Sequence, residues 1–268
     1  MPLSGDLAVV IPARNESDRI AATVTAAARL AGADLIVVVD DGSADGTAEA
    51  AEAAGAMVVR HGRNRGKAAA MQTGAETVRR IEAGQDKPGA ARPGDQSAPR
   101  HLLFLDADLA NSAAAAGPLA GPVRAGQADM TIAVFSSRVR RGGFGLVVRL
   151  SGGGIERATG WRPAEPLNGQ RCLTRAAFTA ALPLAPGWGA ETGMTIDLLR
   201  QGMRVAEVQV PLSHRATGRD WRAQLHRAAQ LAGVARALAA RRPLRRPGSA
   251  GLAAAGPAEQ EQPRRLPS

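Results

Sequence analysis

The chain has 268 residues, of which 45% are hydrophobic and 22% charged, and it contains one cysteine. These values lie near the averages of globular proteins and exclude collagen-like, disulfide-scaffold and wholly disordered chains. A chain of this length buries roughly 70–75% of the surface that it exposes when unfolded, so its core needs no metal or disulfide to form. Because Cys172 has no second cysteine to pair with, the composition is typical of a reducing compartment, and we expect the cytoplasm.

The formal net charge is +10 and the isoelectric point is about 11.4, which favours anionic partners. Aromatic residues make up only 3% of the chain and tyrosine is absent, so few side chains could stack on bases and we expect no nucleic-acid partner. Anionic small molecules or an anionic membrane surface fit the charge better. No stretch of about 18 residues lacks charges, and residues 1–6 do not resemble a signal peptide. We therefore expect neither a membrane span nor export by that route.

In the first half of the chain, short β-branched runs alternate with longer alanine-rich runs. The expected strands are 7–11, 35–39, 57–60 and 102–105, and the helices that follow them begin at about Glu16, Ala44, Gly66 and Ser112. This βαβα series predicts an α/β fold of Rossmann-like type, with a mainly parallel sheet and helices on both faces. Ligands are then expected at the carboxyl ends of the strands.

The second half is expected to complete one domain over residues 1–240. Its elements are a strand at 130–135, an Arg/Gly-rich loop at 136–145, a glycine cluster at 151–154, a helix at 189–202, a strand at 204–210 and an amphipathic helix at 220–239. We expect the loop and the glycine cluster to order over a ligand. Residues 83–100 read as a flexible surface insertion, and residues 241–268 as a disordered basic tail.

Chemistry-bearing residues follow each strand of the first half. The first strand ends in Ile-Pro-Ala-Arg-Asn-Glu (11–16), and the second in Asp-Asp-Gly-Ser (40–43). The third helix opens with Asn-Arg-Gly-Lys (64–67), where a helix N-terminus and a lysine could meet a phosphate. The fourth strand ends in Asp-Ala-Asp (106–108), whose two carboxylates would point the same way on an extended segment and could hold Mg²⁺ or Mn²⁺.

These four motifs, in this order, resemble the GT-A glycosyltransferases of the family 2 type. The second half is similar to the glucosyl-3-phosphoglycerate synthase family, through Pro-Leu-Asn-Gly (166–169), the stretch 182–191 and Ser-His-Arg (213–215). The resemblance covers roughly residues 7–240. It implies a donor half at about 1–135 and an acceptor half at about 136–240.

The resemblance also implies roles for single residues. The nucleotide-binding group would be Pro12, Ala13, Arg14, Glu16, Asp40, Asp41, Ser43, Lys67 and Asp106. Within it, Asp40 or Asp41 would read the base, Lys67 would contact the nucleotide, and Asp106 would support the ribose or the metal. Asp108 and His214 would bind the metal. Asp108 and Glu191 are the catalytic candidates, with Glu191 near the sugar or acceptor. The implied activity is metal-dependent transfer from a nucleoside-diphosphate sugar, with a UDP-sugar favoured.

One stretch departs from the synthase-like pattern. Where that family has polar anchors for a small dianionic acceptor, this chain has Phe144 and Leu146 in a glycine-rich loop. Nearby Arg140, Arg141, Arg149 and Arg157 could supply the charge instead. The acceptor is therefore expected to be anionic, either a phosphorylated small molecule or a polyprenyl phosphate.

Two other functional classes are compatible with the sequence. A sugar-phosphate nucleotidyltransferase would share the architecture and the metal, but it normally has a Gly-x-Gly-Thr-Arg stretch where this chain has residues 12–16. A non-catalytic nucleotide-sugar-binding module at a membrane surface would use the basic helix at 221–238. The stereochemistry of transfer, inverting or retaining, and the oligomeric state stay open.

Overall fold

The computed structural model describes residues 5–84, 98–135, 145–211 and 221–241, with side chains in the last range from residue 230 on. A sheet of seven strands crosses it in the order β3-β2-β1-β4-β6-β5-β7. The strands are β1 (Leu7–Ala13), β2 (Ala33–Asp40), β3 (Met57–Arg60), β4 (His101–Phe104), β5 (Met130–Phe135), β6 (Arg171–Leu173) and β7 (Val205–Val210). Strands β1 to β4 are parallel, as are β5 and β7, whereas β6 runs antiparallel between β4 and β5.

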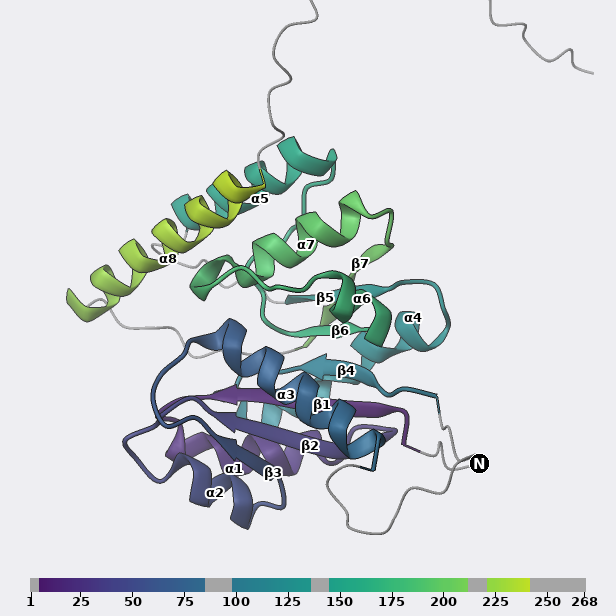
Figure 1. Ribbon diagram of the computed structural model, residues 1–268, viewed down its shortest axis with the longest axis vertical. Coiled ribbons are helices and arrows are strands. Elements are labelled where there is room, and N and C mark those ends of the chain that lie inside the picture. The colour runs from purple at the N-terminus through teal and green to yellow at the C-terminus, as the bar shows by residue number, and fades with distance from the viewer. Residues whose placement is uncertain (1–4, 85–97, 136–144, 212–220, 242–268) are drawn as a thin grey trace, which may run out of the picture.

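Helices cover both faces of this sheet (Figure 1). They are α1 (Ser17–Ala27), α2 (Thr47–Ala53), α3 (Lys67–Glu82), α4 (Ala120–Arg124), α5 (Gly145–Thr159), α6 (Arg175–Ala180), α7 (Ala190–Arg200) and α8 (Trp221–Ala240), with 3-10 turns η1 (Ala110–Leu119) and η2 (Gly187–Gly189). One core cluster joins the sheet to α1 and η1, and the other joins it to α3, α6 and α7. The predicted α/β fold with a mainly parallel sheet is confirmed.

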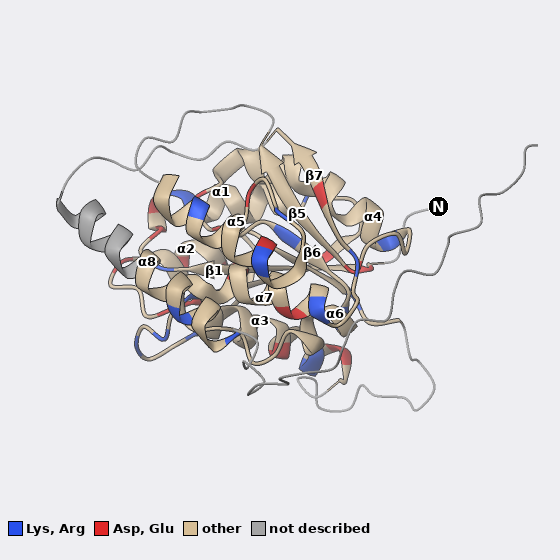
Figure 2. Cartoon of the chain, turned by 90° about the horizontal axis from the view of Figure 1, so that it is seen from above, with Lys and Arg blue, Asp and Glu red and all other residues tan. Residues whose placement is uncertain are grey.

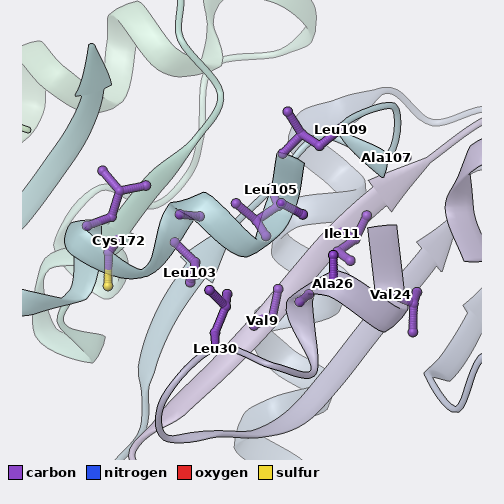
Figure 3. Close-up of a cluster of buried hydrophobic side chains, with 14 of the residues drawn as sticks. Val9, Ile11, Val24, Ala26, Leu30, Leu103, Leu105, Ala107, Leu109 and Cys172 are labelled. Atoms are coloured by element: carbon purple, nitrogen blue, oxygen red, sulfur yellow. The ribbon is translucent and has the colours of Figure 1, made fainter. Parts of the chain in front are cut away.

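Alternate residues of the strands supply the two cores. Val9 and Ile11 of β1 face α1 and η1, together with Leu103 of β4 (Figure 3). Val10 of β1 and Phe104 of β4 face the opposite core. Each of these five side chains is at most 1% exposed, which explains the continuous apolar runs of the central strands. The carboxyl ends of β1, β2, β3 and β4 therefore emerge along one edge of a rigid sheet.

Most of the predicted elements are present, with three additions. Strand β6 and helices α5 and α6 were not expected from the sequence. The segment after β4, expected as an α-helix from Ser112, is a 3-10 helix as far as Leu119 before α4 begins. Gly117 and Pro118 lie in this segment, and both disfavour a regular α-helix.

The prediction that residues 151–154 form a glycine-rich loop over a ligand is wrong. These residues lie inside α5, and Ser151, Gly152 and Gly154 are buried. A Cβ atom on Gly154 would lie 2.4 Å from a methyl group of Leu238, so this glycine allows α5 and α8 to approach each other closely. The small residues serve helix packing instead of ligand closure.

The last helix packs on the domain along its C-terminal half. Val234 is fully buried and Ala237 is 4% exposed. Arg241, which follows the helix, is paired with Asp197 of α7. Among the described residues, none of the helices combines the length and the apolar character that a membrane span requires.

Two predicted segments lie largely outside the described residues. Of the insertion at 83–100, only residues 83–84 and 98–100 are described, and of the basic tail only Arg241. Arg100 is held to the body of the protein, because its guanidinium contacts the carboxylate of Asp34 at 2.5 Å and that of Glu82 at 3.6 Å.

Charged residues of both signs are interspersed over the face shown in Figure 2.

Candidate active site

The loops that follow β1 and β2 are joined by hydrogen bonds. The N–H of Asn15 donates to Ser43 Oγ (3.0 Å), and Asn15 Oδ1 accepts from the N–H of Ala44 (2.9 Å). The N–H of Glu16 donates to Thr47 Oγ1 at 2.8 Å. Asn15 has a φ of 55°, a left-handed conformation that asparagine tolerates better than most residues. The two motifs at 11–16 and 40–47 therefore form one surface at the sheet edge.

Asp40 and Asp41 both have defined hydrogen-bond partners in this structure. Asp40 Oδ1 accepts from the N–H of Ser43 at 2.9 Å and from its hydroxyl at 2.5 Å, and so closes the turn after β2. Asp41 accepts from the N–H groups of Arg65 (2.8 Å) and Gly66 (2.7 Å), in the loop before α3. The predicted contact of either aspartate with the base stays a prediction.

The carboxyl group of Asp41 has a lowered pKa. Burial alone would raise the pKa of its carboxyl group, but hydrogen bonds from His61 and from the N–H groups of Arg65 and Gly66 outweigh burial, so the pKa is lowered. The Asp41 carboxylate therefore fixes the loop between β3 and α3 at neutral pH.

The aspartates 106 and 108 do not share an extended segment, contrary to the prediction. Strand β4 ends at Phe104, and Ala107 and Asp108 form a turn. Thr23 of α1 holds this turn, because its hydroxyl donates to Ala107 O (2.7 Å) and accepts from the N–H of Ala110 (2.8 Å). The chain leaves the sheet too early for the alternation of a strand to orient both carboxylates.

The ammonium group of Lys67 is the centre of the site. It lies 2.7 Å from Asp106 Oδ1 and 3.0 Å from Glu191 Oε1. Gln170 donates from Nε2 to the other oxygen of Asp106 at 2.6 Å. The Lys67 side chain is 26% exposed, whereas that of Glu191 is 4% exposed. Burial opposes the charge of Lys67, but Asp106 and Glu191 outweigh it and raise the pKa of the ammonium group.

Close approach at this centre depends on a glycine. A Cβ atom on Gly169 would lie 2.3 Å from Lys67 Nζ and 2.7 Å from Asp106 Oδ1. The motif at 166–169 thus has a structural role in the donor-side centre, although the sequence resemblance placed it in the acceptor half.

We expect Gly169→Ala to separate Lys67 from Asp106 and to lower catalytic activity by at least about tenfold, with a smaller loss of stability than removal of the ammonium group itself, because the displaced atoms end flexible side chains. Steady-state kinetics and a thermal melt measure the two effects. Gly121→Ala in α4 is the matched control, since a Cβ there meets nothing within 4 Å. Equal activity of the two variants would contradict the role of Gly169.

Acidic groups gather around Glu16. Burial and the nearby charge of Asp108 raise the pKa of Glu16, Arg19 opposes them, and Asp45 and Asp106 add smaller increases. Arg19 NH1 lies 3.1 Å from Glu16 Oε2. This concentration of negative charge favours a cation. In the part of the chain that the structure describes, no three His, Cys, Asp or Glu side chains meet where they could together hold a metal ion.

The predicted site residues of the 11–16 motif differ from one another in solvent exposure. Ala13 is buried, Pro12 is half-buried and Arg14 is exposed. Other predicted residues, His214, Arg140, Arg141 and Phe144, lie outside the described residues. Leu146 is described, and it is 61% exposed at the start of α5.

Sequence reasoning missed three residues that organise the site: Gln170, His61 and Arg171. Arg171 is fully buried on β6, and it donates to Asn168 O (2.8 Å), Pro166 O (3.1 Å) and Glu191 O (3.1 Å). Burial lowers the pKa of its guanidinium to about 10. It joins the 166–170 loop to the start of α7. No sequence signal identifies it, because arginine is almost never fully buried.

Two hollows among the described residues lie away from the Lys67 centre. The larger, about 500 Å³, lies along β3 and α3 and includes Met57, Arg65 and Thr73. The smaller, about 350 Å³, includes Arg149, Arg162 and Glu207. The Lys67 centre joins the start of α3 to the segment after β4 and to the start of α7.

Comparison with known proteins is consistent with this architecture. Residues 8–80 match the model of a family described as glycosyl transferase family 2. This match covers the motifs at 11–16, 40–43 and 64–67. The fourth motif, at 106–108, follows β4, which is the neighbour of β1 in the sheet. Sequence family and fold together place the chain among the GT-A glycosyltransferases of the family 2 type.

The relatives are themselves glycosyltransferases. The chain is 28% identical to glycosyltransferase AglJ of Haloferax volcanii, over 82% of this chain and 67% of that protein. It is 30% identical to glucosyl-3-phosphoglycerate synthase of Mycobacterium tuberculosis, over 78% of this chain and 66% of that protein. It thus spans about two thirds of the length of these two curated relatives.

Solved structures of the mycobacterial synthase have the same fold. A crystal structure of that enzyme matches with a TM-score of 0.69 at 25% identity, over 91% of this chain and 82% of the other. A complex of the same enzyme with Mn²⁺, UDP-glucose and phosphoglyceric acid matches with a TM-score of 0.67 at 25% identity, over 88% and 79% of the two chains.

Proposed function

We propose that this protein transfers a sugar from a UDP-sugar to a phosphorylated acceptor, with a divalent metal ion bound at the Asp108 turn. The observation that carries the proposal is the Lys67 centre, where an ammonium group lies between the carboxylates of Asp106 and Glu191 at the carboxyl edge of the sheet. The Glu16 carboxyl group feels the charges of both Asp106 and Asp108. The edge of a sheet of this type is where nucleotides bind in α/β proteins. Similarity to an enzyme crystallised with Mn²⁺ and UDP-glucose supports the choice of donor and metal.

The chemistry of the donor set fits a divalent cation. Asp108 offers a carboxylate at a turn, and its charge already raises the pKa of Glu16, so a cation here would relieve repulsion between like charges. Mg²⁺ and Mn²⁺ commonly take one or two protein carboxylates and complete their shell with phosphate oxygens. Asp108 and His214 are the proposed protein ligands. The metal would stabilise the charge that develops on the departing diphosphate.

Lys67 is suited to the same task. An ammonium group has three N–H donors, of which Asp106 and Glu191 use two in this structure. The remaining donor could contact a phosphate oxygen of the donor nucleotide. Stabilisation of this oxygen is worth most when its charge increases, as the glycosidic bond breaks.

Glu191 is better placed to orient Lys67 than to act as a general base. Its carboxylate is buried and already paired with the ammonium group. A base must lie within hydrogen-bond reach of the acceptor hydroxyl, in a form that can take its proton. We therefore assign Glu191 a positioning role beside the sugar.

The donor can be tested directly by ligand stabilisation. The protein would be melted with UDP-, GDP- and ADP-sugars and with nucleoside triphosphates, each with and without Mn²⁺, and hydrolysis or transfer of the stabilising sugar donor would then be assayed. A ligand at 100 times its dissociation constant adds roughly 2.7 kcal/mol to the free energy of unfolding. We expect the largest shift with a UDP-sugar and Mn²⁺ together. Stabilisation by nucleoside triphosphates instead would favour a nucleotidyltransferase, and binding without transfer would favour a non-catalytic module.

The acceptor is predicted to be larger or more apolar than 3-phosphoglycerate. The basis is the sequence departure at Phe144 and Leu146, of which Leu146 is exposed and free of polar anchoring atoms. Losing one charge-assisted hydrogen bond to an anion costs roughly 1.5–3 kcal/mol, so loss of two would lower affinity by two or more orders of magnitude. Transfer to 3-phosphoglycerate and to a short polyprenyl phosphate should be compared under identical conditions. Efficient, saturable transfer to 3-phosphoglycerate would show that the loop retains the acceptor site of the synthase.

A further inference from the structure

A chain of side-chain contacts extends from the site edge to the middle of α3. Asp41 Oδ1 lies 2.7 Å from Nδ1 of His61, and His61 Nε2 lies 3.0 Å from the hydroxyl oxygen of Thr73. His61 is 8% exposed and Asp41 is 5% exposed. His61 immediately follows β3, and Thr73 lies on the second turn of α3. Neither His61 nor Thr73 belongs to the four strand-end motifs.

The direction of the hydrogen bond between His61 and Asp41 follows from the charge of Asp41. The pKa of Asp41 is lowered, so its carboxylate is ionised at neutral pH and can only accept hydrogen bonds. Nδ1 of His61 then donates to Asp41. Nε2 of the same ring shares a second hydrogen bond with the hydroxyl group of Thr73. This pair of bonds fixes the ring orientation and aims Nδ1–H at the carboxylate.

The same carboxylate holds the loop that leads to Lys67. Both of its oxygens are used, Oδ1 by His61 and by the N–H of Arg65, and Oδ2 by the N–H of Gly66. Gly66 precedes α3 with a φ of 90°, and Lys67 is the first residue of that helix. The conformation of the loop therefore decides where the Lys67 side chain begins.

A second contact shows that the loop is closely fitted to the end of β2. A Cβ atom on Gly42, which has a φ of 70°, would lie 2.7 Å from the backbone of Arg63 and of Asn64. The N–H of His61 also donates to Asp40 O at 2.8 Å. Loop and strand end thus meet through backbone contact as well as through Asp41.

From these contacts we infer that His61 is a positioning residue for nucleotide binding: it orients Asp41, which holds the 63–66 loop and so sets the place of Lys67. The inference rests on the proposed function, because it assigns Lys67 the donor nucleotide as its ligand. It separates two roles within the Asp-Asp-Gly-Ser motif. Asp40 closes its own turn through Ser43, while Asp41 acts on the neighbouring loop.

Three single variants separate the contacts of this chain. His61→Ala removes the contacts with Asp41 and with Thr73, whereas His61→Asn keeps a side-chain N–H near the Nδ1 position. Thr73→Val removes only the contact between Thr73 and His61 and keeps the shape of the Thr73 side chain. The probe is UDP with Mn²⁺, titrated by calorimetry. We expect His61→Ala to weaken binding by about tenfold, with His61→Asn and Thr73→Val within about threefold of the wild type. Thermal melting identifies any variant that fails to fold.

A double-mutant cycle tests whether His61 acts through Lys67. In the background of Lys67→Ala, the further change His61→Ala should alter UDP affinity by less than about twofold, because the group that it positions is gone. A purely structural role would give the same loss in both backgrounds. An equal tenfold loss in both, or no loss in either, would overturn the inference.

The loop contact can be followed without a nucleotide. Hydrogen exchange of the Arg65 and Gly66 amides should become at least about tenfold faster in His61→Ala and stay near the wild-type rate in Thr73→Val. If exchange is faster in His61→Ala but the wild-type protein binds no UDP, the role of His61 in holding the loop stands and the proposed donor is rejected. Unchanged exchange in His61→Ala would reject the role of His61 whatever the donor is.

Discussion

Replacing Asp108 by alanine should weaken binding of UDP in the presence of Mn²⁺ by about a hundredfold or more, because the proposed metal loses a carboxylate ligand. The fold should remain intact, since Asp108 lies at a surface turn after β4 and its neighbours Ala107 and Ala110 are held by Thr23. Calorimetric titration with UDP, with and without Mn²⁺, measures the effect. Binding in the absence of metal should change little.

The matched control is Asp18→Ala, which removes an exposed carboxylate from the first turn of α1. Its UDP affinity should equal that of the wild type. If Asp108→Ala binds UDP with Mn²⁺ as tightly as this control, the metal assignment is wrong.

Asp108→Ala should also change the pH dependence of stability. The pKa of Glu16 is raised in the folded state, with burial the largest cause and Asp108 the next. The ordinary pKa of a glutamate carboxyl group is 4.5. When the pKa is higher in the folded state, the folded state loses stability as the pH rises above this ordinary pKa. Removing Asp108 reduces this penalty. Urea titrations should therefore show that the variant gains stability relative to the wild type near pH 7, and that the gain disappears below about pH 4, where Glu16 is protonated in both states.

Replacing Lys67 by methionine should have the largest combined effect on stability and binding. It leaves the Glu191 carboxylate, which is 4% exposed, without the ammonium group 3.0 Å away. Breaking a buried ion pair costs about 3–5 kcal/mol, and we expect ~2–4 kcal/mol here because Lys67 is partly exposed. UDP binding should weaken with and without Mn²⁺. Chemical denaturation and calorimetry measure the two losses.

The double variant Lys67→Met with Glu191→Gln separates these losses. Removing both charges should recover most of the stability, because no unpaired carboxylate remains buried. Nucleotide binding should stay low, because the ammonium group is still missing. Recovery of UDP affinity together with stability would show that Lys67 acts only as the counter-ion of Glu191.

Much of the donor side was predictable from local sequence. Short apolar runs rich in β-branched residues mark the strands at 7–11, 35–39 and 57–60, and all three are present in the structure. Parallel strands carry their carboxyl ends to one edge, so motifs far apart in sequence had to become neighbours. The contacts of Asn15 with Ser43 and of Lys67 with Asp106 follow this rule. Pattern and topology together were sufficient for this part of the site.

Other features depended on partners that no local pattern reveals. Strand β6 has only three residues, too few for an alternation to be recognised, and it exists because β4 and β5 flank it. The Asp106–Asp108 segment continues an apolar strand in sequence, yet Thr23 of α1 draws it into a turn. The glycines at 152–154 read as a loop, but they lie inside α5, where Gly154 packs against Leu238 of α8. In each case a contact between distant segments overrides the local preference.

The sequence by itself determined the class of fold, the edge of the sheet where the chemistry lies and most of the residues gathered there, since these depend on periodicity and on the direction of parallel strands. Only the tertiary structure decided how their charges are paired. Lys67 lies between Asp106 and Glu191, two residues from different elements and far from it in sequence. Arg171 is buried and donates to the backbone of Glu191, and His61 contacts Asp41. Ion pairing depends on separations of a few ångströms, which are set by packing of the whole domain and leave no periodic trace in the sequence.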